Sequence, residues 1–168
     1  MKHTPTHHAP YPNSGTGPIH LDTLDPTTLN HHPHDVITDR NGKPYMTRYF
    51  LHRDHNTRAI QLHHFHNDDP EPDPHDHPWD FTTHILRGSY TEHTHNGTLG
   101  TRYTAGTIRH IQAETAHRLT DVEPDTWTLV ITGPVRRGWG YHTQRGWIGW
   151  RDYQRARSEF LSGGPRPG

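Results

Sequence analysis

Polar and apolar residues alternate over short stretches of this chain, with the two-residue period of half-buried β-strands. Between residues 58 and 66, the even positions from Ile60 onward fall on one face of the predicted strand and the odd positions fall on the other. Comparable runs recur at residues 36–38, 44–51, 79–86, 90–95, 101–103, 107–111, 117–120, 127–132 and 136–142. This pattern predicts many short strands.

Turn residues separate these runs. The dipeptides Asn41-Gly42, Arg87-Gly88 and Asn96-Gly97 each place a glycine where the chain is expected to reverse between antiparallel strands. Only residues 151–161 space their apolar side chains at a helical period. The sequence therefore predicts an all-β sandwich or small barrel with one short C-terminal helix.

The chain has 168 residues, which is enough for one ordinary domain, and we assign this domain to residues 34–161. Residues 1–33 are rich in Pro, Thr, His and Gly without periodicity, and we expect them to form a flexible N-terminal arm. Residues 162–168 are expected to be a disordered tail.

Composition narrows the function classes. The formal net charge is -1, and the basic residues are dispersed along the sequence, which argues against a nucleic-acid partner. There is no cysteine, so a metal site would have to use nitrogen and oxygen ligands. No apolar run is long enough for a membrane partner, and the longest aliphatic run is Leu129-Val130-Ile131. We expect a cytoplasmic protein that acts on a small-molecule substrate.

Histidine is unusually frequent, at 20 residues, so His-x-His spacing alone is a weak signal. One pair nevertheless stands out. His75 and His77 are two residues apart, and residues at this spacing on a strand point to the same face. His117 lies on a separate predicted strand and could complete the pair. The three side chains are the predicted ligands of one divalent metal ion.

The spacing around these histidines resembles the cupin superfamily. Gly88 follows His75 and His77 where the glycine that closes the first cupin motif belongs. The second motif is matched by Gly106, five residues, Gln112-Ala113-Glu114, two residues and then His117, although its internal proline and glycine are missing. The resemblance implies a double-stranded β-helix barrel, or jelly roll, with His75, His77 and His117 as metal ligands and with a possible homodimer.

The first motif departs from the cupin pattern at its acidic ligand, because Phe81 or Thr82 stands where the glutamate is expected. One alternative is a three-histidine site, as in the thiol dioxygenases that resemble cysteine dioxygenase. The other is that Asp80 supplies the carboxylate of a two-histidine, one-carboxylate site. Strand alternation turns Asp80 away from His75 and His77, so we favour three histidines, with Asp80 orienting a ligand from outside the metal's coordination sphere.

Two further side chains are candidates for the catalytic site. Arg118, next to His117, could pair with a substrate carboxylate or phosphate. His64 could line the barrel interior. The first functional hypothesis is a mononuclear non-haem Fe(II) dioxygenase or oxygenase of a small organic molecule. Its alternatives are a non-redox isomerase, epimerase or lyase that uses Zn, Ni or Mn as a Lewis acid, and a non-catalytic module that binds a sugar or another small molecule.

Overall fold

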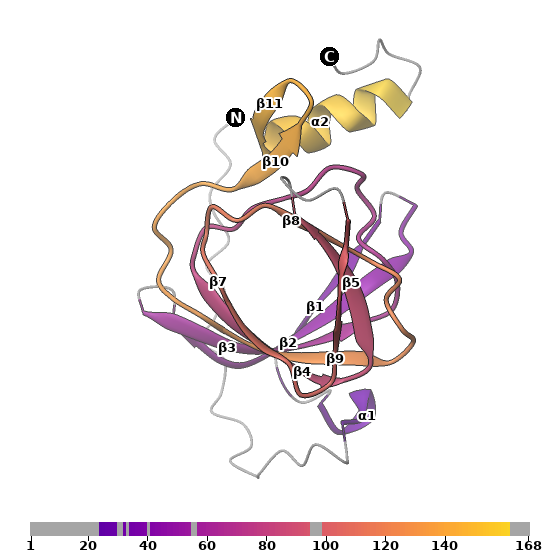
Figure 1. Ribbon diagram of the computed structural model, residues 1–168, viewed down its shortest axis with the longest axis vertical. Coiled ribbons are helices and arrows are strands. Elements are labelled where there is room, and N and C mark those ends of the chain that lie inside the picture. The colour runs from indigo at the N-terminus through magenta and orange to yellow at the C-terminus, as the bar shows by residue number, and fades with distance from the viewer. Residues whose placement is uncertain are drawn as a thin grey trace, which may run out of the picture.

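The computed structural model describes residues 24–29, 32, 34–39, 41–54, 57–94 and 99–161. Antiparallel strands wrap around a common interior, and a hairpin and a helix cover one end (Figure 1). The elements are α1 (Pro26–Leu29), β1 (His34–Thr38), β2 (Pro44–Asp54), β3 (Arg58–Phe65), β4 (Phe81–Arg87), β5 (Ser89–Thr94), β6 (Thr101–Thr104), β7 (Ile108–Ile111), β8 (His117–Thr120), β9 (Thr126–Thr132), β10 (Gly140–Thr143), β11 (Gly146–Gly149) and α2 (Trp150–Leu161).

Two sheets form the barrel wall. The larger has the strand order β1-β2-β3-β9-β4-β7, and the smaller has the order β6-β5-β8. The β10–β11 hairpin leads directly into α2, and Figure 1 shows both lying over one end of the barrel. The predicted all-β class with one C-terminal helix is confirmed.

The two faces of β3 pack against different apolar clusters, as its alternating pattern requires. Phe65 points into the barrel, where it packs with Met46, Ile85, Tyr90 and Leu119. Leu62 points to the outer face, and its cluster contains Leu24, Leu29, Tyr49 and Trp127. Two of these partners flank or belong to α1, so part of the expected N-terminal arm packs on the outside of the barrel wall.

Gly88, which the sequence marked as a motif glycine, makes the turn between β4 and β5. Its φ of 72° lies in the left-handed region, which L side chains rarely adopt. A Cβ at this position would lie 2.9 Å from the Cα of Thr126. Both constraints favour glycine here. Most of the predicted arm, residues 1–33, and the whole of the tail, residues 162–168, lie outside the described residues.

Candidate metal centre

The segment that carries His75 and His77 is extended and is bonded between two strands. His75 N–H donates to His117 O and His117 N–H donates to His75 O, each at 2.9 Å. His77 N–H donates to Ala113 O, also at 2.9 Å, and His75 forms a further antiparallel bridge with Tyr141 of β10. These bonds fix the segment beside β8, which carries His117.

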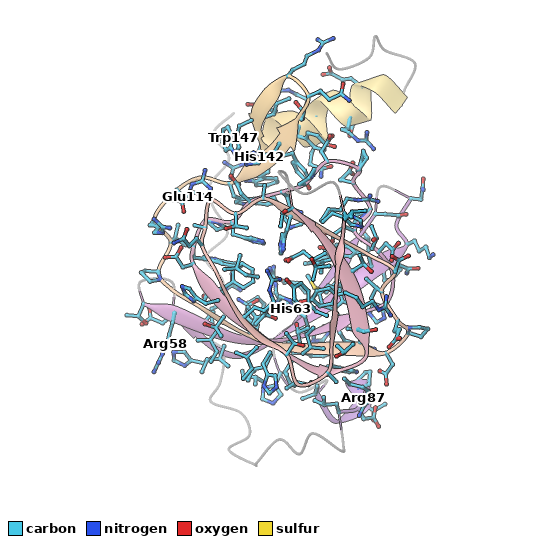
Figure 2. The ribbon with its side chains drawn as sticks, viewed as in Figure 1. Arg58, His63, Arg87, Glu114, His142 and Trp147 are labelled. Atoms are coloured by element: carbon cyan, nitrogen blue, oxygen red, sulfur yellow. The ribbon has the colours of Figure 1, made fainter. Side chains whose placement is uncertain are left out.

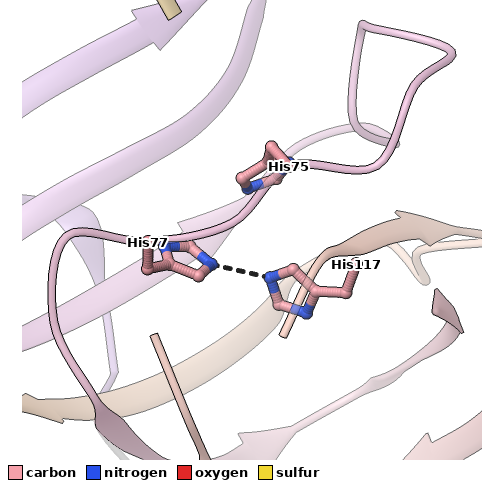
Figure 3. Close-up of side chains that lie close together, drawn as sticks. All are labelled: His75, His77 and His117. Atoms are coloured by element: carbon pink, nitrogen blue, oxygen red, sulfur yellow. Dashed lines mark hydrogen bonds between the residues drawn. The ribbon is translucent and has the colours of Figure 1, made fainter. Parts of the chain in front are cut away.

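The three histidine side chains converge, as their spacing predicted (Figure 3). Their candidate ligand atoms all lie within 4.8 Å of one another, and Nε2 of His77 is 2.8 Å from Nε2 of His117. His117 is buried, and the other two side chains are partly buried. This group is able to hold a metal ion, because each imidazole offers one nitrogen to the same small volume.

Burial keeps the first two imidazoles in the neutral form that metal ligation needs. Desolvation lowers the pKa of His75 to about 4, and this effect outweighs the opposing influence of the Asp69 carboxylate. Desolvation, reinforced by the neighbouring His117 and His75, also lowers the pKa of His77 well below its ordinary value. At neutral pH, neither ring has to lose a proton before it binds a cation.

A buried carboxylate fixes the third imidazole. Oε1 of Glu92 lies 2.6 Å from Nδ1 of His117, and Arg109 forms a close ion pair with the same carboxylate. Burial raises the pKa of Glu92, but the hydrogen bond from His117 and the charge of Arg109 hold it below its ordinary value. Ionised Glu92 therefore accepts a hydrogen bond from Nδ1–H of His117. The other ring nitrogen, Nε2, then carries the lone pair and faces the other two histidines.

Sequence reasoning missed Glu92. Its position could have been found from alternation along β5, where Tyr90 and Glu92 both face inward and are both buried. A carboxylate on the buried face of a strand is costly unless it has partners, which marks it as a functional or structural anchor. The cupin motif directs attention to the residues after His77, where no glutamate stands.

The histidines line a cavity of about 760 Å³ inside the barrel. His63 also lines it, and Figure 2 shows this residue in the barrel interior. Much of the wall is aromatic. Trp79 stacks on His77 with ring centroids 5.0 Å apart, and Phe81 meets His77 edge-on at 4.7 Å. Phe81 occupies one of the two positions where the motif would have its acid, so an apolar ring contacts the histidine there.

The carboxylate of Asp80 is not brought to the three histidines. It accepts a hydrogen bond of 2.7 Å from Ala113 N–H and one of 2.6 Å from Arg136, and it does not line the cavity. This placement follows the alternation argument, because Phe81 points inward and its neighbour points outward. Among the described residues, the group able to hold a metal consists of histidines only.

Arg118 and His64 also lie outside the cavity lining. On β8, His117 and Leu119 are buried and line the cavity, so Arg118 between them points to the other face. His64 is on the outer face of β3, where it stacks on Trp127 at 4.2 Å. The expectation that His64 lines the interior is therefore corrected by the structure: its neighbour His63 does.

Asp76, between His75 and His77, points away from the cavity and is fully buried. Its carboxylate accepts hydrogen bonds from the Gly140 backbone at 2.7 Å, from Arg137 at 2.8 Å and from Trp147 at 2.9 Å. Nε2 of His142 lies 3.1 Å from Oδ2 of Asp76, the oxygen that also accepts the hydrogen bonds from Arg137 and Trp147. Trp147 and His142 belong to the hairpin over the barrel end (Figure 2). Asp76 thus joins the segment that carries His75 and His77 to this hairpin.

Solved structures with the same fold support the resemblance found in the sequence. An RmlC-like cupin protein from Ralstonia eutropha JMP134 is 15% identical, with a TM-score of 0.51 over 86% of this chain and 90% of that chain. The Fe(II) form of HppE is 12% identical, with a TM-score of 0.51 over 61% of this chain and 57% of that chain. The DMSP lyase DddQ from Ruegeria pomeroyi DSS-3 is 12% identical, with a TM-score of 0.51 over 64% of this chain and 59% of that chain.

No family model and no curated protein sequence matches this chain. The structural likeness, at these low identities, establishes the fold. The chain has the cupin fold, a double-stranded β-helix, as the motif spacing indicated. Within the described part of the chain, no helix is both long enough and apolar enough to span a membrane.

Proposed function

We propose that the protein is a metal-dependent enzyme that acts on a small organic molecule at the three-histidine centre, with Fe(II) as the metal and dioxygen as the co-substrate. The observation that carries the proposal is the convergence of His75, His77 and His117 on one volume at the wall of a large interior cavity. Three neutral ligands suit a mononuclear site that keeps coordination positions for substrate.

A ferrous ion held by these imidazoles would supply one-electron and dioxygen chemistry. The surrounding residues have separate tasks. Glu92 holds His117 in the tautomer whose Nε2 faces the other ligands. Trp79 and Phe81 pack on His77 and exclude water from its side of the centre. Because Phe81 stands where a carboxylate would stand, the protein adds no negative charge there, and this favours a substrate that is anionic or that chelates the metal.

A second candidate function uses the same ligands without redox chemistry. Zn, Ni or Mn in a site of three neutral imidazoles would retain its full charge as a Lewis acid, which suits isomerase, epimerase or lyase reactions. The likeness in fold to a DMSP lyase is compatible with this alternative. Dioxygen consumption separates the two candidates, because only the first requires it. A homodimer remains a prediction.

The metal proposal is tested by loading metal-stripped protein with Fe(II) under anaerobic conditions, and with Zn, Ni and Mn in parallel. We expect one ion per chain, and we expect His77→Ala or His117→Ala to abolish stoichiometric binding. His52→Ala is the matched control, because His52 is exposed and lies outside the cavity lining. Stoichiometric binding that survives the triple alanine variant of the three ligands would refute the site.

The redox proposal is tested with the Fe(II)-loaded protein, a panel of small organic anions and a dioxygen electrode. We expect substrate-dependent dioxygen uptake that the His117→Ala variant loses. Turnover of a panel member by the Zn or Mn form without dioxygen would instead support the second candidate.

A further inference from the structure

The cavity beside the three histidines contains one strongly basic side chain. Among its described lining residues, Arg48 is the only lysine or arginine. It lies on β2 in register with His63 of β3, and it is two residues from Met46, which packs in the barrel interior. Because residues two apart on a strand share a face, Arg48 stands on the inner wall. Its positive charge also helps to lower the pKa of His63, to about 3, after the larger effect of burial.

The guanidinium of Arg48 is only partly satisfied by the protein. Nη2 pairs with Asp35 at 3.1 Å, but the side chain of Asp35 is 49% exposed, so this pair is weak. Nε of Arg48 is buried and has no hydrogen-bond partner among the described residues. A buried donor without a partner costs free energy that an oxyanion in the cavity would recover.

The acidic residues of the cavity wall, in contrast, already have partners. Asp39 accepts the backbone N–H groups of Asn41 and Lys43, each at 2.8 Å. Asp69 accepts Leu119 N–H at 2.8 Å. The carboxylate of the third, Glu71, pairs with Arg157 of α2 at 2.7 Å. Each of these acids is thus engaged by a backbone donor or by a cation, whereas Nε of Arg48, the one strongly basic group of the described lining, has no hydrogen-bond partner among the described residues.

We propose that Arg48 is a specificity-determining residue that binds a carboxylate of the ligand, so that the cavity selects small organic carboxylates with an apolar body. The aromatic wall suits that body, and guanidinium donors suit the planar carboxylate. That the bound molecule is also a substrate rests on the function proposed above. Binding of the carboxylate at Arg48 requires no metal.

The probe is phenylacetate, with the neutral phenylacetamide as its isosteric partner, and binding is measured by calorimetry on metal-stripped full-length protein. We expect phenylacetate to bind more tightly than the amide. Arg48→Met should weaken phenylacetate binding by at least about tenfold, the loss expected for a hydrogen bond to a charged group, and should change amide binding by less than about twofold. The matched control is Arg53→Met, since Arg53 stacks on Phe50 from the same strand but does not line this cavity.

A second variant keeps the test decisive if Arg48→Met fails to fold. Asp35→Asn removes the competing carboxylate at an exposed position, and it should tighten phenylacetate binding by up to about fivefold. Equal affinity of phenylacetate for wild type and Arg48→Met, or for wild type and Asp35→Asn where only the latter folds, overturns the proposal. Arg48-dependent binding in a protein that takes up no metal would defeat the proposed function while sustaining this inference. Stoichiometric metal binding, together with a phenylacetate affinity that Arg48→Met leaves unchanged, would sustain the proposed function and defeat this inference.

Discussion

Replacing Glu92 with glutamine separates the metal-site role of this carboxylate from its structural role. Glutamine is nearly isosteric, and its amide oxygen can still accept a hydrogen bond from Nδ1–H of His117. It cannot balance the charge of Arg109, and it is a weaker acceptor than the carboxylate. Two effects are therefore expected, one on metal affinity and one on the stability of the metal-free fold.

The structure sets the size of each effect. The Glu92 side chain is only 2% exposed, whereas that of Arg109 is 20% exposed. Breaking a buried ion pair by removing one partner costs about 3–5 kcal/mol, and partial access of water to Arg109 reduces the expected loss to about 2–4 kcal/mol. Loss of the acceptor that orients a metal-ligating histidine typically weakens metal affinity by about 10–100-fold.

The stability loss is measured by urea unfolding of metal-free protein, and the affinity loss by competition of zinc between the protein and a chelator of known affinity. Glu123→Gln is the control, because its partner Arg102 and Glu123 itself are about half exposed, and a change below about 1 kcal/mol with unchanged zinc affinity is expected. If Glu92→Gln lowered stability but left zinc affinity within twofold of wild type, the assignment of Glu92 as the residue that positions His117 would be refuted.

Three further predictions use the same assays. Zinc at about 100 times its dissociation constant should stabilise wild type by about 2.7 kcal/mol, which is roughly 5 °C or more in Tm, and His117→Ala should show no such shift. Asp76→Asn should cost about 2–4 kcal/mol, because Arg137 then loses its buried counter-charge; an unchanged unfolding midpoint would contradict the anchoring role. The pKa of His63 is lowered to about 3 in the fold, so the unfolded state binds more protons between that pH and about 6.5. Metal-free wild type should therefore lose about 2 kcal/mol more stability than His63→Gln between pH 7 and pH 5, and equal losses would disprove a buried neutral His63.

The barrel and the convergence of the three histidines could be predicted because both depend on local regularities. The two-residue period fixes that His75 and His77 share a side, and glycines such as Gly88 mark turns that other residues cannot make. The distance in sequence to His117 carries further information, since a chance pair of histidines would not be followed by correctly spaced motif glycines. These signals require no knowledge of which strands pair.

The parts that sequence reasoning missed depend on pairing between distant strands. Alternation separates His63 from His64, but it does not say which face is interior, and that is decided by the α1 segment packing over the outer face. Glu92 meets His117 because β5 pairs with β8, which is a contact between strands that are not neighbours in sequence. Arg118 follows His117 directly in sequence and points to the opposite face, because neighbouring residues on a strand alternate between its faces. The same alternation places His75 and His77, two residues apart, on one face.

The balance of charge connects the candidate centre to its proposed ligand. A divalent cation held by three neutral imidazoles would bring two positive charges to the cavity, and Arg48 adds a third on the wall. Glu92 offsets part of this charge, but it is already shared between His117 and Arg109. On the wall, Glu71 is paired with Arg157, whereas the contacts of Asp39 and Asp69 with uncharged backbone N–H groups leave their carboxylate charges in this balance. In our proposal, a carboxylate of the ligand pairs locally with the guanidinium of Arg48, whose Nε has no hydrogen-bond partner among the described residues. The apolar Phe81 at the acid position and the incompletely partnered Arg48 therefore point to the same property of the bound molecule, a negative charge.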